Sequence, residues 1–288
     1  MAAAARLAPA KVNLFLHVGP PEADGYHPLA SLVAFADVGD RLTVEPAAQL
    51  SLSVAGPFAG GLSDQGDNLV LRAVRALALA AGIGEPGLAI TLDKQLPIAA
   101  GLGGGSSDAG AVLTLARDAL GLSLDDAALA EIAACIGADG PMCLHARAAW
   151  AEGRGDVLTF ERGLPPLTAL LVNPGVPSST GAVYRAFDAE PSGRADCPAP
   201  PSDWRASTVI DWLGAQRNDL QAPAVALAPA IGEALSVTAA LPGARLTRMS
   251  GSGATVFALF DTIAAAGAAG EALSAVQPGW WVRATTLR

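Results

Sequence analysis

The sequence predicts an α+β protein of two lobes, and three observations support that fold class. The 288 residues are enough for two packed lobes, and a hydrophobic content of 51% can fill both cores. Short apolar or alternating runs, typical of strands, are interleaved with helical patterns along the whole chain. Glycine and proline gather at residues 163–166, which places the expected domains at residues 1–163 and 164–288.

The first domain is expected to open with an antiparallel sheet and to continue with helices. Apolar or alternating runs separated by Gly, Pro and Asp predict strands at 7–18, 29–36, 41–45 and 50–54. Apolar residues at i, i+3 and i+4 predict a helix over 68–81, with Asp67 as a candidate cap. A strand over 87–92 then leads into a glycine-rich turn. The remaining elements of this domain are helices at 106–120 and 125–136 and strands at 148–151 and 157–161.

The second domain shows the same mixture of patterns. A buried strand at 167–172 is followed by a short helix at 181–187, a polar, proline-rich surface loop at 190–202 and helices through residue 241. The last segments predict strand, strand, helix and strand, at 245–249, 255–260, 263–276 and 280–285.

The turn from Pro97 to Ser107 has the composition of a phosphate-binding loop. Its many glycines permit positive φ and let backbone N–H groups approach an anion closely. Ser106 and Ser107 fall where the helix is expected to begin, so either serine can cap the helix or donate its hydroxyl to phosphate. No Gly-Lys-Ser/Thr follows, which excludes a Walker A loop, and the last glycine of G-x-G-x-x-G is missing. The alternative is a flexible connection.

Composition narrows the class of partner and the compartment. The net charge of −9 and the lack of a Lys/Arg cluster argue against a nucleic-acid surface, so a small-molecule partner is expected. Three cysteines without paired spacing suit a reducing compartment. No signal peptide or membrane helix is expected, which predicts a cytoplasmic protein. The chain has sixteen arginines and two lysines, Lys11 and Lys94, and both lysines lie beside candidate site motifs unless chance placed them there.

Three segments, in order, resemble the motifs of the GHMP kinases, the small-molecule kinases named for galactokinase, homoserine kinase, mevalonate kinase and phosphomevalonate kinase. They are Ala8–Leu14, Pro97–Ser107 and Met249–Phe257. The resemblance spans most of the chain and implies a ribosomal-S5-like nucleotide domain followed by a ferredoxin-like C-terminal domain. Gly-Tyr-His at 25–27 and Gly-Ala-Asp at 137–139 are similar to one branch of the family. That branch phosphorylates the 2-hydroxyl of a cytidine diphosphate sugar alcohol in non-mevalonate isoprenoid biosynthesis.

The resemblance implies that ATP, accompanied by Mg²⁺, binds at the glycine-rich loop. The residues expected to hold ATP are Asn68, Lys94, Pro97, Gly101, Leu102, Gly103, Gly104, Gly105, Ser106 and Ser107. Asn68 and Lys94 match positions near adenine and ribose, although each by itself suits a solvated surface equally well. The loop has Ala99 and Ala100 where the family often has glycine, and alanine at negative φ is expected to fit there. No residue pattern indicates a protein ligand for Mg²⁺ or an oligomeric state.

Two residues are candidates for catalysis. Asp139 stands in Gly-Ala-Asp-Gly-Pro, where the flanking glycines and the proline predict a tight turn that presents a carboxylate. By resemblance Asp139 takes the acceptor proton, and Lys11 pairs with it and stabilises charge. The alternatives are an aspartate that only organises its turn and a lysine exposed at a strand edge. Asn13 lies on the same strand face as Lys11 and is expected to help orient the acceptor.

Acceptor recognition is assigned to aromatic residues. Tyr26 offers a face for stacking, His27 offers ring nitrogens for a cytosine edge, and Tyr184 is the candidate for the opposite face. A core or loop role is the alternative for all three. Whether Asn218, Asp219 or the segment 251–253 contacts ligand stays open, because a tight turn explains the segment equally well. Two other functions stay open: a GHMP kinase with another acceptor, such as homoserine or mevalonate, and a catalytically silent nucleotide-binding or sugar-sensing protein.

Overall fold

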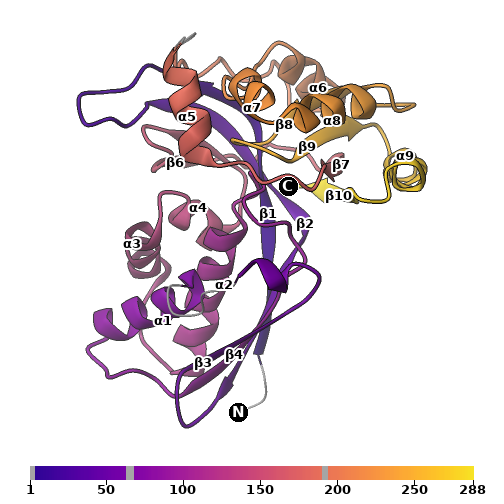
Figure 1. Ribbon diagram of the computed structural model, residues 1–288. Coiled ribbons are helices and arrows are strands. Elements are labelled where there is room, and N and C mark those ends of the chain that lie inside the picture. The colour runs from indigo at the N-terminus through magenta and orange to yellow at the C-terminus, as the bar shows by residue number, and fades with distance from the viewer. Residues whose placement is uncertain (1–3, 63–67, 190–193) are drawn as a thin grey trace. The chain divides into compact units, whose positions relative to one another are not determined.

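The computed structural model describes residues 4–62, 68–189 and 194–288, and the chain forms two compact units (Figure 1). Unit 1 comprises residues 1–10, 38–98 and 103–146, and unit 2 comprises residues 11–37, 99–102 and 147–288. Both units therefore draw on separate stretches of the sequence. The predicted domains, in contrast, are two continuous stretches, residues 1–163 and 164–288. The assignment of nucleotide binding to the first and acceptor binding to the second stays a prediction.

Unit 1 contains a small mixed sheet. Its strands belong to β1 (Ala4–Val18), β2 (Leu29–Pro46), β3 (Ser51–Ala55) and β4 (Leu88–Asp93). β3 runs parallel to β4, β4 pairs antiparallel with Arg41–Pro46 of β2, and β1 pairs with β2.

The prediction of two strands in place of β2 was wrong, because the strand continues through residues 37–40. Gly and Asp residues in this stretch favour a break between strands. Instead, a Cβ on Gly39 would lie 2.1 Å from the Ala8 carbonyl oxygen, so this glycine permits close strand contact. Asp40 is buried and forms an ion pair, so it does not need solvent.

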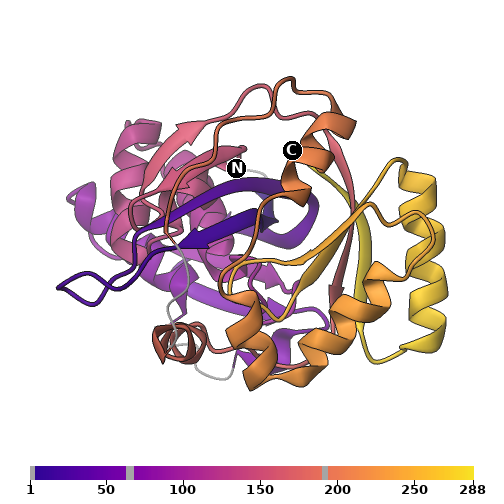
Figure 2. The same ribbon diagram turned by 90° about the horizontal axis from the view of Figure 1, so that it is seen from above.

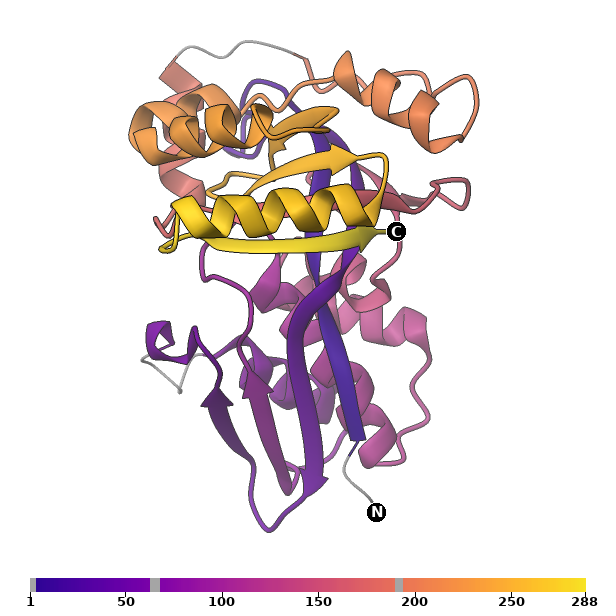
Figure 3. The ribbon, with the colours of Figure 1, turned by 90° about the vertical axis from the view of Figure 1, so that its right-hand side faces the viewer.

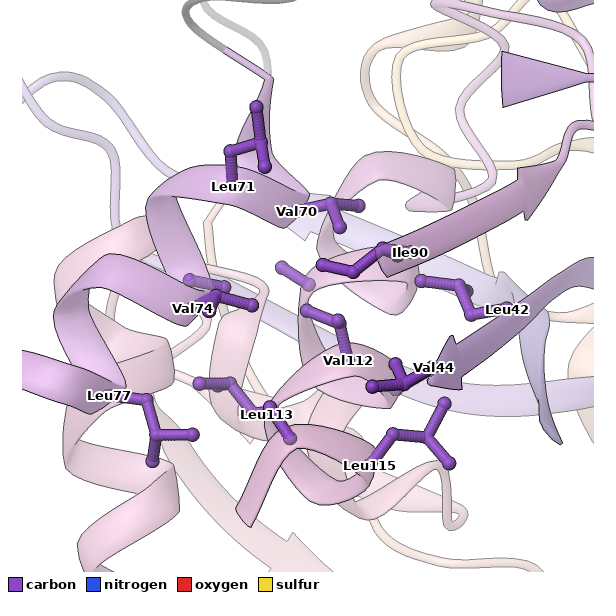
Figure 4. Close-up of a cluster of buried hydrophobic side chains, with 14 of the residues drawn as sticks. Leu42, Val44, Val70, Leu71, Val74, Leu77, Ile90, Val112, Leu113 and Leu115 are labelled. Atoms are coloured by element: carbon purple, nitrogen blue, oxygen red, sulfur yellow. The ribbon is translucent and has the colours of Figure 1, made fainter. Parts of the chain in front are cut away.

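Four helices cover the sheet of unit 1. They are α1 (Leu69–Ala80), α2 (Gly104–Ala119), α3 (Asp126–Ile136) and α4 (Gly140–His145), with a short 3-10 turn, η1 (Ala59–Gly61). Apolar side chains of the strands, such as Val44 and Ile90, point toward Val70 of α1 and Val112 of α2 (Figure 4). Asn68, expected inside the first helix, is its N-cap, and Asp67 lies outside the described residues. α4 was not predicted because its six residues include glycine and proline, although proline fits the first turn of a helix.

The C-terminal part of unit 2 contains four consecutive antiparallel strands of its sheet. β7 (Leu167–Asn173), β8 (Leu246–Met249), β9 (Val256–Phe260) and β10 (Trp281–Leu287) stand in the order β10-β7-β9-β8. Helices separate β7 from β8 and β9 from β10, as in a split βαβ arrangement. This order confirms the expected ferredoxin-like domain. β5 (Ala149–Glu152) pairs with β6 (Val157–Phe160) and with the first half of β2.

The helices of unit 2 are α5 (Thr180–Ala189), α6 (Ala206–Gly214), α7 (Gln221–Leu227), α8 (Pro229–Ala239) and α9 (Ile263–Val276). α8 packs on Val256, and α9 packs on Ala258 and Phe260. Because these three residues alternate along β9, both helices lie on one face of the sheet. Figure 3 shows α9 lying along β10. Within the described residues, no helix is long and apolar enough to cross a membrane.

Candidate active site

The glycine-rich loop between β4 and α2 packs closely on a turn that joins β8 to β9. Gly101 and Gly103 have φ of +72° and +62°, in the region that favours glycine. A Cβ on Gly101 would lie 2.3 Å from the carbonyl oxygen of Ser250, so no larger residue fits there unchanged. The Ser250 hydroxyl donates to the Gly101 carbonyl oxygen at 2.9 Å. The sequence predicts that the backbone of this loop approaches a ligand closely. The contact between Gly101 and Ser250 shows that the loop also needs glycine in order to pack within the fold.

Ala99 corrects one expectation. Its φ is +51°, so the prediction that alanine is accommodated at negative φ was wrong at this position. A left-handed conformation costs an L-residue about 1–2 kcal/mol, and the surrounding hydrogen bonds must hold it. The Ala99 carbonyl accepts from Ser178 N–H at 3.3 Å, and the Ala100 carbonyl accepts from Thr255 N–H at 3.0 Å.

Helix α2 begins at Gly104, two residues earlier than predicted. Its N-cap is Gly103, which has no side chain to cap the helix, so Ser106 and Ser107 lie in the first turn and the predicted capping role was wrong. The first backbone N–H groups of an α-helix have no acceptor inside the helix, and its dipole adds partial positive charge there. These are the features of an anion site. The Ser107 hydroxyl is buried and has no hydrogen-bond partner among the described residues.

Lys94 lies in a buried cluster beneath the start of α2. Its Nζ is 2.5 Å from Oδ2 of Asp40 on β2 and 2.7 Å from Oδ2 of Asp108 on α2. At Gly104, a Cβ would lie 3.3 Å from Lys94 Nζ. All three charged side chains are at most 4% exposed. The possibility that Lys94 is a solvated surface residue is therefore excluded.

Burial and charge oppose each other in this cluster. Burial by itself would lower the pKa of Lys94, but the two carboxylates outweigh it and the net pKa is raised. Burial raises the pKa of Asp108, and Asp40 adds to that rise while Lys94 opposes it, which leaves a pKa of about 7. Both carboxylate oxygens of Asp40 have hydrogen-bond donors, because Oδ1 accepts from the backbone N–H groups of Gln95 and Leu96, at 2.6 and 2.8 Å. In Asp108, Oδ1 is buried and has no hydrogen-bond partner among the described residues.

Asp139 belongs to unit 1 and is the N-cap residue of α4. The Gly140 N–H donates to the Gly137 carbonyl at 2.8 Å, which closes the predicted turn. A Cβ on Gly140 would lie 2.0 Å from the Ala133 carbonyl oxygen, so this glycine is required. The carboxylate of Asp139 makes no capping hydrogen bond to α4, so helix capping does not explain an aspartate at this position.

Lys11 and Asn13 belong to unit 2 and lie on β1. Lys11 is buried, which excludes the alternative of an exposed strand-edge lysine, and its N–H donates to the Leu102 carbonyl at 2.8 Å. The Asn13 N–H donates to the Ser250 hydroxyl at 3.2 Å, and its side-chain amide donates to Ser31 at 2.8 Å. Within the described part of the chain, the buried Asn13 Oδ1 has no hydrogen-bond partner. β1, the loop and Ser250 therefore share one hydrogen-bonded network.

The three aromatic candidates lie near the connection between β1 and β2, which projects from unit 2 (Figure 2), and on α5. Tyr26 is 57% exposed, and the Arg154 guanidinium lies 4.3 Å from its ring centroid. His27 Nε2 is 2.6 Å from Oδ1 of Asp188, and the His27 ring centroid is 4.8 Å from that of Tyr184. His27 and Tyr184 are thus brought together. Stacking of a base between Tyr26 and Tyr184 stays a prediction.

Several residues that shape these sites are not predicted from the sequence. Asp40, Asp108 and Asp188 each meet a partner outside their own segment, and among them Asp108 has a local signal because it follows Ser107 directly. Ser250 lies within the motif Met249–Phe257, but its contact with Gly101 is not predicted. Asn218, left open before, donates through its side-chain amide to the carbonyls of Met249 and Gly251, both at 2.8 Å. Asp219 accepts from the Val18 N–H at 2.8 Å. These contacts give Asn218 and Asp219 structural roles.

No group of three or more His, Cys, Asp or Glu side chains within the described ranges is arranged to hold a metal ion. Mg²⁺ commonly reaches phosphoryl-transfer sites on the nucleotide, with few protein ligands.

Comparison with known proteins defines the class. Residues 68–147 match the family described as GHMP kinases N terminal domain, and residues 207–279 match GHMP kinases C terminal. The chain belongs to the GHMP kinase family.

Relatives within the family share most of the chain. A 4-diphosphocytidyl-2-C-methyl-D-erythritol kinase of Caulobacter vibrioides (strain NA1000 / CB15N) is 53% identical, over 97% of this chain and 98% of the relative. The enzyme of the same name from Methylobacterium radiotolerans is 51% identical, with 98% of both chains covered. A crystal structure of 4-(cytidine 5'-diphospho)-2C-methyl-D-erythritol kinase matches with a TM-score of 0.80 and 37% identity, over 99% of both chains. L. major mevalonate kinase is more distant, with a TM-score of 0.68 and 15% identity over 99% of this chain and 96% of that chain, and this likeness shows the fold alone.

Proposed function

We propose that this chain transfers the γ-phosphoryl group of ATP to the 2-hydroxyl of 4-diphosphocytidyl-2-C-methyl-D-erythritol, a step of non-mevalonate isoprenoid biosynthesis. The observation that carries the proposal is the 53% identity to a kinase named for this acceptor, over nearly the whole of both chains. The similarity extends to the three-dimensional structure, because the solved kinase with the corresponding name aligns over 99% of this chain.

ATP, with Mg²⁺ on its phosphates, binds at the glycine-rich loop and the first turn of α2. The N–H groups from Gly103 to Ser106 supply donors, the helix dipole adds partial positive charge, and the glycines at 103–105 place no side chain between these donors and the phosphates. Asn68 and Lys94 act near the base and ribose. Lys94 is held in position by the buried ion pairs with Asp40 and Asp108. The Oδ1 of Asn68 is fixed by the hydrogen bond that caps α1.

The chemical step forms a bond between the acceptor 2-oxygen and the γ-phosphorus and breaks the bond from that phosphorus to the β–γ bridging oxygen, releasing ADP. Asp139 accepts the proton of the 2-hydroxyl as that oxygen attacks. Lys11 offsets negative charge on the transferring phosphoryl group, and Asn13 orients the acceptor. The buried Asn13 Oδ1, which lacks a partner among the described residues, supports a polar role for this side chain.

The cytosine of the acceptor is held by Tyr26, His27 and Tyr184. A carboxylate oxygen of Asp188 accepts from His27 Nε2–H at 2.6 Å, which leaves Nδ1 as the ring nitrogen that can accept a hydrogen bond. Such an acceptor complements the exocyclic amine of cytosine and meets an oxygen in uracil. His27, oriented by Asp188, thereby favours a cytidine acceptor over a uridine one.

Steady-state ADP release with three acceptors tests this function. The cytidine diphosphate sugar alcohol is expected to support turnover, whereas homoserine and mevalonate are not. Efficient turnover with homoserine or mevalonate would move the chain to another branch of the family. Absence of turnover with every acceptor, in a protein that binds ATP, would favour the catalytically silent alternative.

The reaction is proposed to take place in the cytoplasm. The three cysteines are free thiols, as expected in a reducing compartment. Fractionation of the source cells tests this point.

A further inference from the structure

The buried cluster of Asp40, Lys94 and Asp108 has an excess of negative charge under an anion site. Two carboxylates face one ammonium group, at 2.5 and 2.7 Å, and all three side chains are buried. The cluster touches the first turn of α2, because a Cβ at Gly104 would lie 3.3 Å from Lys94 Nζ and 3.6 Å from Asp40 Oδ2. The nucleotide phosphates, with several negative charges, are proposed to bind at this same turn. Like charges at short range in a poorly solvated site repel strongly.

The two carboxylates differ in how they are satisfied. Asp40 accepts hydrogen bonds from two backbone N–H groups through Oδ1 and from Lys94 through Oδ2, so both of its oxygens have a donor. Asp108 accepts from Lys94 through Oδ2, whereas its buried Oδ1 has no hydrogen-bond partner within the described residues. An unsatisfied buried carboxylate oxygen is the place where a proton costs least. Asp108 is therefore the member of the cluster that can lose its charge.

We propose that Asp108 is a positioning residue that takes up a proton from solvent when nucleotide phosphates bind to the first turn of α2, so that Lys94 and Asp40 remain as a neutral pair beneath the bound anion. The inference rests on the proposed ATP site. It adds that ATP binding is linked to proton uptake at one identified carboxylate. The pKa of Asp108, raised to about 7 by burial, places this event near neutral pH.

Other ionisable groups around α2 are less suited to this role. Its packing partners are α1, α3 and α4, and Asp108 on this helix also meets Lys94, which directly follows β4 and pairs with Asp40 of β2. The ionisable side chains on α1 and α3 are exposed, and on α4 Cys143 is buried, with Sγ 4.0 Å from the Gly103 carbonyl, while His145 is half-buried. The groups concerned are Arg72, Arg75, Asp126, Glu131, Cys135, Cys143 and His145, with Arg41, Glu45 and Asp93 on the strands and Arg117 and Asp118 at the far end of α2. Lys94 and Asp40 are the charges that act most on Asp108.

Calorimetric titration of the full chain with MgATP, without acceptor and in two buffers of different ionisation enthalpy, measures the protons taken up on binding. The raised pKa of Asp108 lies close enough to neutral pH that the carboxyl is partly ionised before binding, so its complete protonation takes up a fraction of one proton per site. The wild type is expected to exceed Asp108→Asn by about that amount. Subtracting the variant also removes any contribution from the nucleotide's own phosphates. Asp118→Asn, on the same helix but 60% exposed, is the matched control and is expected to behave as wild type.

A second variant keeps the test decisive if Asp108→Asn does not fold. Asp40→Asn removes one negative charge but retains an oxygen that can accept from Gln95 and Leu96, and it is expected to abolish the uptake as well. Equal uptake in wild type and in the folded variants, or no uptake by wild type, would overturn the inference while leaving the ATP site intact. Absence of MgATP binding by wild type would overturn the proposed nucleotide site and this inference together.

Discussion

Replacing Gly101 with alanine tests whether the loop is built for close backbone contact. The substitution places a Cβ 2.3 Å from the Ser250 carbonyl oxygen and within 3 Å of two Gly253 backbone atoms, at a φ of +72°. The left-handed conformation costs an L-residue about 1–2 kcal/mol, and forcing extra volume into a packed site costs about 1–3 kcal/mol more. We therefore expect Gly101→Ala to lower the free energy of unfolding by about 2–5 kcal/mol.

Gly175→Ala separates the two contributions. Gly175 has a similar φ of +76° and lies in the same unit, but its Cβ would meet only an ordinary contact, 3.5 Å from the Gly279 carbonyl oxygen. This control is expected to lose only the conformational term, about 1–2 kcal/mol. Urea denaturation of the two variants and the wild type gives the difference. Equal losses in both variants would refute the steric reasoning, and a loss below about 1 kcal/mol in Gly101→Ala would refute the whole assignment of strain.

Three further outcomes follow from the site. Asp139→Asn is expected to retain MgATP binding and lose about 10²-fold to 10⁴-fold in kcat, the range for a general base, and near-normal turnover would remove Asp139 from catalysis. Asp108 has a native pKa of about 7, above its unfolded value near 4, so its contribution to stability is present at low pH and is lost as the pH rises through 7. The midpoint temperature of thermal unfolding is thus expected to fall more steeply from pH 5 to pH 8 in wild type than in Asp108→Asn. Parallel profiles of the two proteins would contradict the raised pKa of Asp108. Asp188→Ala is expected to raise the acceptor KM roughly tenfold, because a hydrogen bond to a charged group contributes about 1.5 kcal/mol, while the ATP KM stays unchanged; an equal rise in both KM values would instead indicate a structural defect.

Local patterns predicted most elements of the fold. Helix α9 and the strands around it follow from hydrophobic periodicity, and the strand order confirmed the ferredoxin-like arrangement that the resemblance implied. Periodicity failed at β2, where Gly39 and Asp40 look like a turn but lie inside one strand. Their roles depend on contacts with Ala8 and Lys94, which no local window contains.

The candidate site shows the same limit. The glycine-rich loop, Lys11 and Asp139 were found from motifs, because their chemistry depends on short segments. The partners that satisfy or orient the site were not found: Lys94 meets Asp40 across 54 residues, and His27 meets Asp188 across 161. Ala99 at positive φ was also unpredictable, since the strain is sustained by hydrogen bonds to residues far along the chain.

Identification of the reaction product tests whether this chain phosphorylates the proposed hydroxyl. The protein, MgATP and 4-diphosphocytidyl-2-C-methyl-D-erythritol are incubated, ADP is quantified, and the product is examined by ³¹P NMR, with Asp139→Asn as the inactive control and Asp126→Asn, an exposed aspartate on α3, as the matched active one. We expect one ADP per new phosphomonoester, with the new phosphate on the 2-hydroxyl. ADP release without that ester, or a phosphate on another hydroxyl, would contradict the proposed function.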